Sequence, residues 1–345
     1  MTMYELARSL LFRLDAETSH DIVMRTMSLA ARHEALTRRL QRSYGSKVPA
    51  APVEAMGLHF RNPVGLAAGL DKHAAAGPAF CALGFGFVEL GTVTPEAQPG
   101  NPKPRMFRVA TDRAIINRMG FNSPGLDAFL RNLRRARPGC VTGINIGKNA
   151  ATPIARALDD YRMCLRAVYE DADYVTVNIS SPNTSGLRTL QDSSGLHVLL
   201  AGLRQCRHEL FDQTGRHVPI AVKIAPDLDE AQIDVIAKSC QRHRMDAIIA
   251  TNTTVSRPAG FDPRFAGETG GLSGEPLRDM STAVVAALCR RLDGALPVIA
   301  AGGVSSGRDA VEKLDAGARL VQLYTGLIYR GPGLVREVAE SIAAR

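Results

Sequence analysis

The stretch Tyr174-Val-Thr-Val-Asn-Ile-Ser-Ser-Pro-Asn183 joins a short apolar run to a polar loop. Residues 174–177 are aromatic or β-branched, which predicts a buried β-strand. The hexapeptide from Asn178 to Asn183 predicts a loop at the carboxyl end of that strand. Such a loop can hold amide and hydroxyl groups rigidly for a ligand, but the same residue types are common in simple turns. Taken alone, the hexapeptide leaves both interpretations open.

Seven other apolar runs of similar length occur along the chain, and helix-like segments separate most neighbours. Continuous apolar strands that alternate with helices are typical of a parallel sheet. Eight such strands over about 280 residues predict an α/β fold, a closed (β/α)8 TIM barrel. A doubly wound sheet is the alternative, but its Gly-x-Gly-x-x-Gly fingerprint is broken after Gly84-Phe-Gly86. The expected strands are residues 63–68, 87–91, 141–146, 174–178, 220–223, 247–250, 298–301 and 320–324.

Composition limits the kinds of partner. The 345-residue chain is 45% hydrophobic, which is enough to bury a large core, and it carries a net charge of +8 with a pI near 9.4. This charge favours anionic partners such as phosphate cofactors, carboxylate substrates and acidic lipid surfaces. Nucleic acid is not expected, because the chain lacks Trp, is only 5% aromatic and shows no zinc-finger or RNA-recognition signature.

The six cysteines, at positions 81, 140, 164, 206, 240 and 289, are widely scattered. They form no Cys-x-x-Cys pair and have no histidine at metal-ligand spacing, so we expect reduced thiols in the core and no metal site. The amino terminus lacks the charged region, apolar core and small-residue cleavage site of a signal peptide. We therefore expect the protein to stay in a reducing compartment.

Residues 1–45 predict an amphipathic helical segment that precedes a catalytic barrel domain of residues 46–345. Apolar side chains recur at helical spacing from Tyr4 to Leu14 and again from Ile22 to Ala31, which predicts two short helices. Residues 1–48 hold eight Lys or Arg and five Asp or Glu. Residues 1–42 therefore suit contact with an anionic membrane surface, although simple packing on the barrel would explain the pattern as well. A flexible-looking connector, residues 43–52, follows.

In a barrel, the carboxyl ends of all strands meet at one rim, where barrel enzymes hold their active sites. Gly302-Gly303 and Thr325-Gly326 follow the last two expected strands and predict a phosphate site made by backbone amides. Four asparagines at the rim would suit a planar, amide-rich ring, because amides both donate and accept hydrogen bonds without adding charge. These asparagines are Asn145, Asn178, Asn183 and Asn252.

Lys223 ends an apolar strand, where an unpaired ammonium is costly to bury. Three partners would explain it. One is the N1 and C2-carbonyl edge of a flavin, and another is a carbonyl that forms an imine with the lysine. The third is an ion pair with a nearby acid such as Asp246.

The segment Asn117-Arg-Met-Gly-Phe-Asn122 follows an expected hairpin of residues 105–109 and 114–116, and it supplies further donors. Arg118, together with Lys72, could bind a substrate carboxylate. The rim segments contain no histidine and no cluster of metal ligands, so hydrolysis is disfavoured. Ser181 is then left as the proton-transfer group. Side chains alternate in direction along the segment, so the Ser180 side chain should point away from the site.

Six motifs stand out in chain order. They are Ala67-Ala-Gly-Leu-Asp-Lys72, Asn117-Arg-Met-Gly-Phe-Asn122, Gly143-Ile-Asn-Ile-Gly-Lys-Asn149, Val177-Asn-Ile-Ser-Ser-Pro-Asn-Thr184, Gly186-Leu-Arg-Thr-Leu-Gln191 and Gly270-Gly-Leu-Ser-Gly274. In this order they resemble the motifs of the dihydroorotate dehydrogenase family, and specifically its class II branch, which is membrane-associated and quinone-linked. The resemblance runs over essentially the whole chain.

The resemblance implies oxidation of (S)-dihydroorotate to orotate in pyrimidine (UMP) biosynthesis, with FMN as the cofactor. Ser181 would remove the C5 proton while hydride leaves C6 for the flavin. By this resemblance FMN contacts Ala68, Gly69, Leu70, Asp71, Lys72, Thr92, Asn145, Asn178, Lys223, Thr251, Gly274, Gly303, Tyr324 and Thr325. The substrate contacts implied are Lys72, Asn117, Arg118, Met119, Gly120, Phe121, Asn178, Asn183, Asn252 and Thr253.

In class I relatives a cysteine takes the place of the base, so a serine indicates class II and a membrane quinone as electron acceptor. The resemblance places His20, Arg108 and Tyr324 near the quinone path, and it makes Thr184 and Phe121 candidates for a proton relay. It also implies a peripheral protein on the cytoplasmic side of the cell inner membrane. Two other functions remain open on the residues alone: a lyase or isomerase with an imine at Lys223, and a non-enzymatic membrane-binding module.

Overall fold

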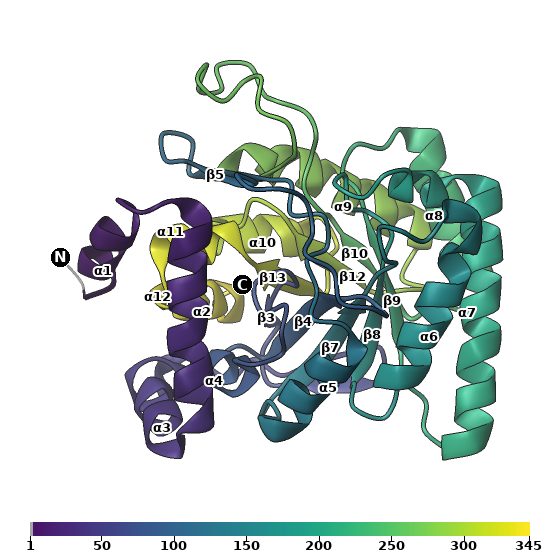
Figure 1. Cartoon of the computed structure of the whole chain (residues 1–345), viewed down its shortest axis with the longest axis horizontal. Helices are drawn as coiled ribbons and strands as arrows, with labels where there is room; N and C mark the ends of the chain where they lie inside the picture. The colour runs from purple at the N-terminus through teal and green to yellow at the C-terminus, as the bar shows by residue number, and fades with distance from the viewer. Residues whose placement is uncertain (1–2) are drawn as a thin grey trace.

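Residues 3–345 are described by the computed structural model, and they form a closed barrel of eight parallel strands (Figure 1). Around the barrel the strands follow the order β10, β12, β13, β3, β4, β7, β8 and β9, and β9 pairs with β10 to close it. The eight expected strands are confirmed, with differences of one or two residues at some ends. The strands are β3 (Val64–Leu66), β4 (Phe87–Val93), β7 (Val141–Ile146), β8 (Tyr174–Asn178), β9 (Ile220–Ile224), β10 (Ala247–Ala250), β12 (Val298–Ala301) and β13 (Leu320–Leu323).

Side chains on each strand alternate between the barrel interior and the surrounding helices. On β8, Val175 and Val177 pack in the large apolar cluster outside the barrel, whereas Tyr174 packs in a smaller cluster inside it. All five residues of β8 are buried. Burial on both faces explains why the strands are continuous apolar runs in the sequence.

Helices lie outside the strands (Figure 1). Helix α8 shows why such segments are helical: Asp229 and Gln232 form a capping box at its start, and its buried residues recur three or four positions apart from Ile233 to Cys240. The outer helices are α4 (Gly77–Ala82), α5 (Leu126–Arg135), α6 (Ala157–Val168), α7 (Ser193–Thr214), α8 (Glu230–Arg242), α9 (Arg278–Leu292), α10 (Gly307–Asp315), α11 (Thr325–Arg330) and α12 (Gly333–Ala343). Short 3-10 helices are η1 (Gly45–Lys47), η2 (Ile154–Arg156), η3 (Leu187–Gln191) and η4 (Glu275–Leu277).

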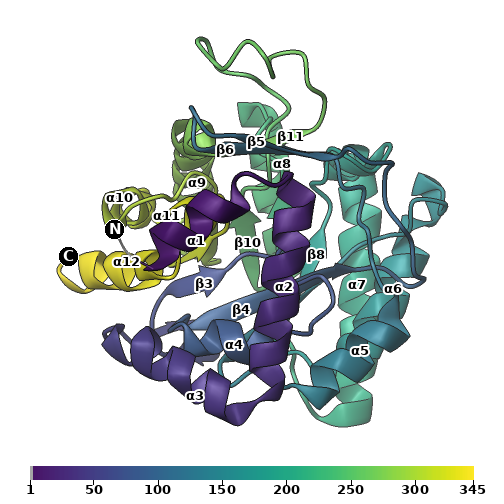
Figure 2. The same cartoon turned by 60° about the vertical axis from the view of Figure 1, so that its left-hand side comes forward.

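The two ends of the barrel carry different additions. At the amino ends of the strands, the hairpin β1 (Val53–Ala55) and β2 (Leu58–Phe60) places Phe60 against Phe87, with ring centroids 5.3 Å apart. At the carboxyl ends lies an antiparallel sheet of β5 (Met106–Val109), β6 (Ala114–Asn117) and β11 (Gly271–Gly274). Figure 2 shows β5, β6 and β11 together above the barrel. The expected hairpin is confirmed, but the third strand of the sheet lies 154 residues further along the chain, in a segment without the apolar pattern of a strand.

Three helices, not the expected two, precede the barrel: α1 (Met3–Leu11), α2 (Ala16–Arg32) and α3 (Glu34–Ser43). The extended backbone of His33 separates α2 from α3, and the few apolar residues of α3 gave a weak periodic signal. The expected flexible connector is also wrong, because Val48 is 3% exposed and packs in the core. Figure 2 shows α1, α2 and α3 along one side of the molecule. Among helices of residues 3–345, none has the length and apolar content needed to cross a membrane.

The expectation of six reduced thiols is wrong for one pair. Cys81, near the end of α4, and Cys140, just before β7, form a disulfide with an S–S distance of 1.96 Å. The two residues are 59 positions apart, so their spacing carried no signal of the pairing. The free thiols of Cys164, Cys206 and Cys240 are buried, as expected.

Candidate active site

A cavity opens at the carboxyl ends of the strands, beneath the three-stranded sheet. Its wall includes residues at or just after the carboxyl ends of β3, β4, β8, β9, β10, β12 and β13, so the predicted rim is confirmed as a single cavity. Most of the predicted site residues line it. They are Ala68, Gly69, Lys72, Thr92, Asn117, Met119, Gly120, Phe121, Asn178, Ser181, Asn183, Lys223, Thr251, Asn252, Thr253, Gly274, Gly303, Tyr324 and Thr325.

Four of the predicted residues lie behind or outside this wall: Leu70, Asp71, Arg118 and Asn145. Asp71 is fully buried and its carboxylate accepts hydrogen bonds from the backbone amides of Ala75 (3.0 Å) and Ala76 (2.8 Å). It therefore shapes the loop after β3. Asn145 is also fully buried, and it supports the wall from below.

The structure does not bring the Arg118 side chain into the cavity. Its guanidinium pairs with Glu268, donates to the Pro104 carbonyl (2.9 Å) and lies 4.7 Å from the centre of the Phe107 ring. The expectation that Arg118 binds a substrate carboxylate is therefore corrected, because its side chain is engaged by the loops beside the β5–β6 hairpin.

Lys72 is the other cation that the sequence predicts for such a carboxylate. Its ammonium lines the cavity and donates to Asn122. Burial, with a smaller contribution from the charge of Arg105, lowers the pKa of Lys72 to about 7. A carboxylate bound next to Lys72 would favour the protonated ammonium.

Glu89 is the main residue that the sequence analysis missed. It lies on β4 inside the barrel, is fully buried, and accepts hydrogen bonds from Asn145 Nδ2 (2.8 Å), Gln322 Nε2 (2.8 Å) and the Tyr174 hydroxyl (3.1 Å). Lys223 Nζ lies 3.9 Å from the same carboxylate. The available signal was a single acid within an apolar strand, which can be buried only with partners.

The carboxylate of Glu89 settles which acid lies beside Lys223. Burial lowers the pKa of Lys223, and the charge of Glu89 opposes that effect. Asp246 was the expected alternative, but it pairs with Arg207 and with His217 instead. Lys223 thus lies on the floor of the cavity beside a buried carboxylate.

Gln322 gives the floor an acceptor that has no partner among residues 3–345. Its Nε2 donates to Glu89, whereas its Oε1 is buried and accepts no hydrogen bond from these residues, and the side chain lines the cavity. A buried, unpaired oxygen costs free energy unless a bound molecule supplies a donor. Lys223 as donor and Gln322 as acceptor together fit the edge of a flat ring that carries both kinds of group.

The two loops after β12 and β13 form one end of the cavity. Gly303 has φ +76°, and a Cβ on it would lie 2.2 Å from the Arg278 Cα. A Cβ on Gly326 would lie 2.1 Å from the Val304 carbonyl oxygen. Larger residues would displace the loop after β12 or the start of α11, so this packing requires glycine at both positions.

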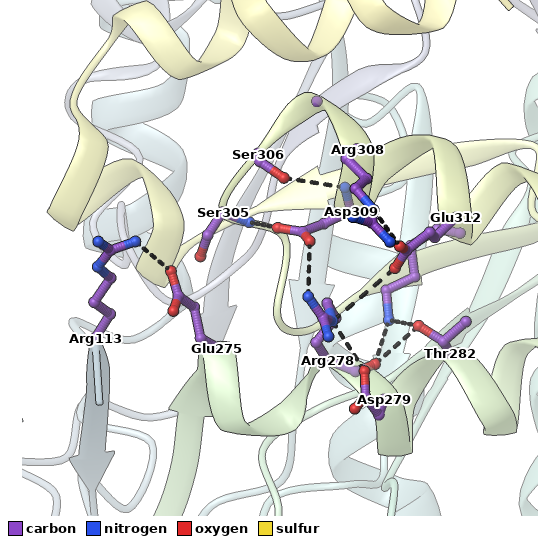
Figure 3. A network of polar contacts seen from close by, with 12 residues as sticks. Arg113, Glu275, Arg278, Asp279, Thr282, Ser305, Ser306, Arg308, Asp309 and Glu312 are labelled. Carbon is purple, nitrogen blue, oxygen red and sulfur yellow. Dashed lines mark hydrogen bonds and ion pairs between the residues drawn. The ribbon is translucent and has the colours of Figure 1, made fainter. Parts of the chain in front are cut away.

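A polar network outside the barrel supports the loop after β12 (Figure 3). The Asp309 carboxylate accepts from the Ser305 amide (2.9 Å) and from Arg278 Nη1 (3.4 Å). Ser281 Oγ donates to the Gly302 carbonyl oxygen (2.9 Å) and also contacts the buried ammonium of Lys313. These contacts fix the loop, so its backbone offers a preformed site for an anion.

Ser181 lies in the cavity wall, is 6% exposed, and its Oγ accepts from the Asn183 amide (3.2 Å). Ser180 points elsewhere, as predicted: its Oγ donates to Asn178 Oδ1 (2.8 Å) and accepts from Asn252 Nδ2 (2.9 Å). Thr184 Oγ1, six residues after Asn178, is buried without a hydrogen bond in the described structure.

Two of the residues named for a quinone path, Arg108 and His20, lie outside the cavity wall, near the amino-terminal helices. Arg108 on β5 donates to the carbonyls of Phe12 and Leu14, both at 3.2 Å, and its guanidinium lies 4.1 Å from the centre of the Phe12 ring. Burial, with a smaller contribution from the charge of Lys72, lowers the pKa of His20 to about 4. The third, Tyr324, donates to the Gly69 carbonyl (3.3 Å).

Comparisons with known proteins agree with this site. The family model described as dihydroorotate dehydrogenase matches residues 50–345. Proteins named dihydroorotate dehydrogenase (quinone) are 55% identical over 342 residues in Burkholderia thailandensis and 56% identical over 344 residues in Ralstonia nicotianae; each match covers 99% of this chain and 98% of the relative. Among solved structures, the enzyme of Eimeria tenella in complex with ferulenol has a TM-score of 0.85 at 41% identity, and covers 95% of this chain and 90% of its own. The ligand-free form has a TM-score of 0.84 at 42% identity, with 95% and 94% covered.

Proposed function

Because the chain belongs to the dihydroorotate dehydrogenase family, we propose that it oxidises (S)-dihydroorotate to orotate in UMP biosynthesis, with FMN as cofactor and a membrane quinone as final electron acceptor. The observation that carries this proposal is a single cavity with three parts. Lys223 and Gln322 form a polar floor, the loops at Gly303 and Gly326 form an anion-binding end, and Ser181 lies in the wall.

FMN fits the residues present. The floor residues would hold the ring edge, with Lys223 donating and Gln322 Oε1 accepting. The backbone of Gly303, Thr325 and neighbouring residues would hold the phosphate. FMN, when bound, supplies the acceptor for the hydride that leaves the substrate. The remaining predicted contacts, including Ala68, Thr92 and Tyr324, lie around the same space.

The substrate would lie between the three-stranded sheet that covers the cavity and the loop after β8. Lys72 would bind its carboxylate, and the side chains of Asn117, Asn178, Asn183 and Asn252 would bind its ring amides. Asn183 Nδ2 already donates to the Asn117 carbonyl (3.1 Å), and this hydrogen bond joins the three-stranded sheet to the loop after β8. Two asparagines from different elements are thus held in one wall before any ligand binds.

Ser181 is the group that takes the C5 proton of dihydroorotate, while the C6 hydrogen leaves as hydride. A serine is a poor base unless its proton can pass to water. Thr184 Oγ1, which has no hydrogen-bond partner among the described residues, is a suitable next member of such a relay. Phe121, the other candidate, lines the cavity.

Membrane contact through residues 1–42 would bring the quinone to the protein, on the cytoplasmic side of the inner membrane. Exposed apolar side chains along the amino-terminal helices support this proposal, since such side chains insert at lipid headgroups when basic residues accompany them. The exposed residues are Leu6, Leu10, Leu14, Ile22, Val23, Leu29 and Leu36. Replacing Leu6 and Leu10 by Glu should reduce flotation with anionic vesicles and slow quinone turnover, while FMN reduction by dihydroorotate stays unchanged.

The proposed reaction is tested on the purified protein by its visible spectrum. We expect a yellow protein whose flavin absorbance is bleached by dihydroorotate without oxygen and restored by a soluble quinone. A colourless protein that releases no flavin on denaturation would contradict the cofactor, and a yellow protein that dihydroorotate does not bleach would contradict the substrate.

The lowered pKa of the buried Lys223 would also suit an imine-forming enzyme. Borohydride treatment in the presence of a carbonyl substrate distinguishes the two functions. Covalent trapping at Lys223 would favour the imine, whereas we expect no adduct, because Glu89 lies beside the ammonium and favours its protonated form.

A further inference from the structure

Arg188 lies outside the cavity wall, yet its guanidinium joins the loops after β8 and β10, which form part of that wall, to the loop after β9. It is on η3, after the loop that carries Ser181. Nε donates to the Ser180 carbonyl (3.0 Å), Nη1 to Asp227 Oδ2 (2.8 Å) and Nη2 to the Thr253 carbonyl (2.8 Å). The three acceptors follow β8, β9 and β10, respectively. The planar guanidinium group thus joins three loops that follow neighbouring strands.

The contact to Ser180 acts directly on the orientation of Ser181. The carbonyl oxygen of Ser180 lies in the plane of the peptide that leads to Ser181, so fixing that oxygen fixes the plane. Asn252 Nδ2 holds the same residue from the other side through Ser180 Oγ (2.9 Å). The direction of the Ser181 Cα–Cβ bond is then set in part by Arg188, which lies outside the cavity wall.

We call Arg188, Asp227 and the hydrogen bonds that they make the clamp. Asp227 adds further contacts to the loop after β10. Its Oδ2 also accepts from the Val255 amide (3.3 Å), and its carboxylate contacts the Thr254 hydroxyl. The side chains of Arg188 and Asp227 are 23% and 17% exposed, so water competes weakly with these contacts. Leu187 and Leu190 are buried on either side of Arg188 and anchor η3.

We propose that Arg188 is a positioning residue for the reaction, which orients Ser181 and Thr253 toward the bound substrate without contacting it. The inference rests on the proposed function, in which Ser181 takes the C5 proton. A small misplacement of a reacting group costs about 100-fold in rate even when ligands still bind. The clamp therefore acts on the chemical step more than on affinity.

The test measures flavin reduction by dihydroorotate in anaerobic stopped flow, together with FMN content and the Kd of orotate. We expect Arg188→Ala to keep its FMN and to bind orotate within about three-fold of the original protein, but to reduce flavin about 100-fold more slowly. Guanidinium ion at tens of millimolar should raise the rate of flavin reduction by this variant at least about ten-fold, because the ion can bind where the Arg188 guanidinium group was.

Arg216→Ala is the matched control. Arg216 also donates to three backbone carbonyls, those of Tyr169, Glu170 and Ala172, but at the amino ends of the strands. We expect this variant to reduce flavin at the original rate, with no acceleration by guanidinium.

Flavin reduction by Arg188→Ala within about two-fold of the original rate would overturn the inference. So would a slow variant that guanidinium fails to restore and whose orotate affinity falls in parallel. If Arg188→Ala does not fold, Arg188→Lys takes its place, and an unchanged rate in that variant contradicts the clamp. If the original protein is not bleached by dihydroorotate, it is the proposed function that fails.

Discussion

The two ends of the barrel differ in what the same strands place inside it. At the amino ends, Phe60, Phe87 and Tyr174 pack edge to face in a closed apolar plug, with ring centroids 5.3 and 6.4 Å apart. At the carboxyl ends the interior is polar, with Lys223 and Gln322 exposed to the cavity. The Tyr174 hydroxyl contacts Glu89 (3.1 Å), which marks the boundary between the two.

Along one strand, the residues that stabilise the fold are therefore different from the residues that line the cavity. Tyr174 begins β8 in the plug, and Asn178 ends it in the cavity wall, four residues later. The plug holds the strands in place through apolar burial, so the rim can keep polar groups that would destabilise an ordinary core. Changes at the rim should therefore alter rates, and changes at the plug should alter stability.

The largest effect expected at the rim is that of Ser181→Ala. Removing the proton acceptor should slow flavin reduction by dihydroorotate about 10²–10⁴-fold, while FMN content and the Kd of orotate stay unchanged. Ser181→Cys is the conservative control, and its rate should rise with pH as the thiol ionises, near an ordinary pKa of about 8.5. Unchanged reduction by Ser181→Ala would show that another group takes the proton.

The largest effect expected at the plug is that of Phe87→Ala. Phe87 is fully buried among apolar residues, so its truncation should lower the free energy of unfolding by about 3–5 kcal/mol. Denaturant unfolding measures this loss. The flavin of the folded variant should still be reduced at the original rate, and a parallel fall in that rate would show that the two ends are not independent.

The disulfide offers a second change at the amino end. A cross-link between residues 59 positions apart stabilises a protein by about 2–4 kcal/mol. Replacing both Cys81 and Cys140 by Ser should therefore lower Tm without a change in the rate of flavin reduction. Cys289→Ser, at a free and partly buried thiol, should change Tm less, and equal losses in the two variants would argue against the cross-link.

The smallest effect expected is a pH dependence at the rim. Lys72 has a pKa of about 7 in the protein without ligand, and only its protonated form attracts a carboxylate. Orotate affinity should be constant below pH 7 and fall by at most about ten-fold per pH unit above it. Titration of the flavin spectrum with orotate from pH 6 to 9 measures this. Lys72→Gln should bind weakly with no such slope, and a flat profile in the original protein would exclude Lys72 as the carboxylate partner.

Much of the site was predictable because a parallel barrel collects the carboxyl ends of its strands at one rim. Ser181, Asn178, Lys223 and Gly303 were predicted from their positions after apolar runs, and they line one cavity. Arg118 failed the same reasoning, since its sequence position was right but the direction of its side chain depends on Glu268, 150 residues away. Sequence position fixes where a Cα lies in this fold, and contacts from distant segments fix where a long side chain points.

The sequence by itself determined the eight strands, the rim and the family, because apolar periodicity and motifs are properties of neighbouring residues. Only the tertiary structure decided the partners: Glu89 beside Lys223, Cys81 with Cys140, β11 beside β6, and Arg188 across three loops. Each of these joins segments far apart in the chain, and the pattern around either partner carries no information about the other. Their energies arise from burial and from directional contacts, which exist only once the barrel has closed.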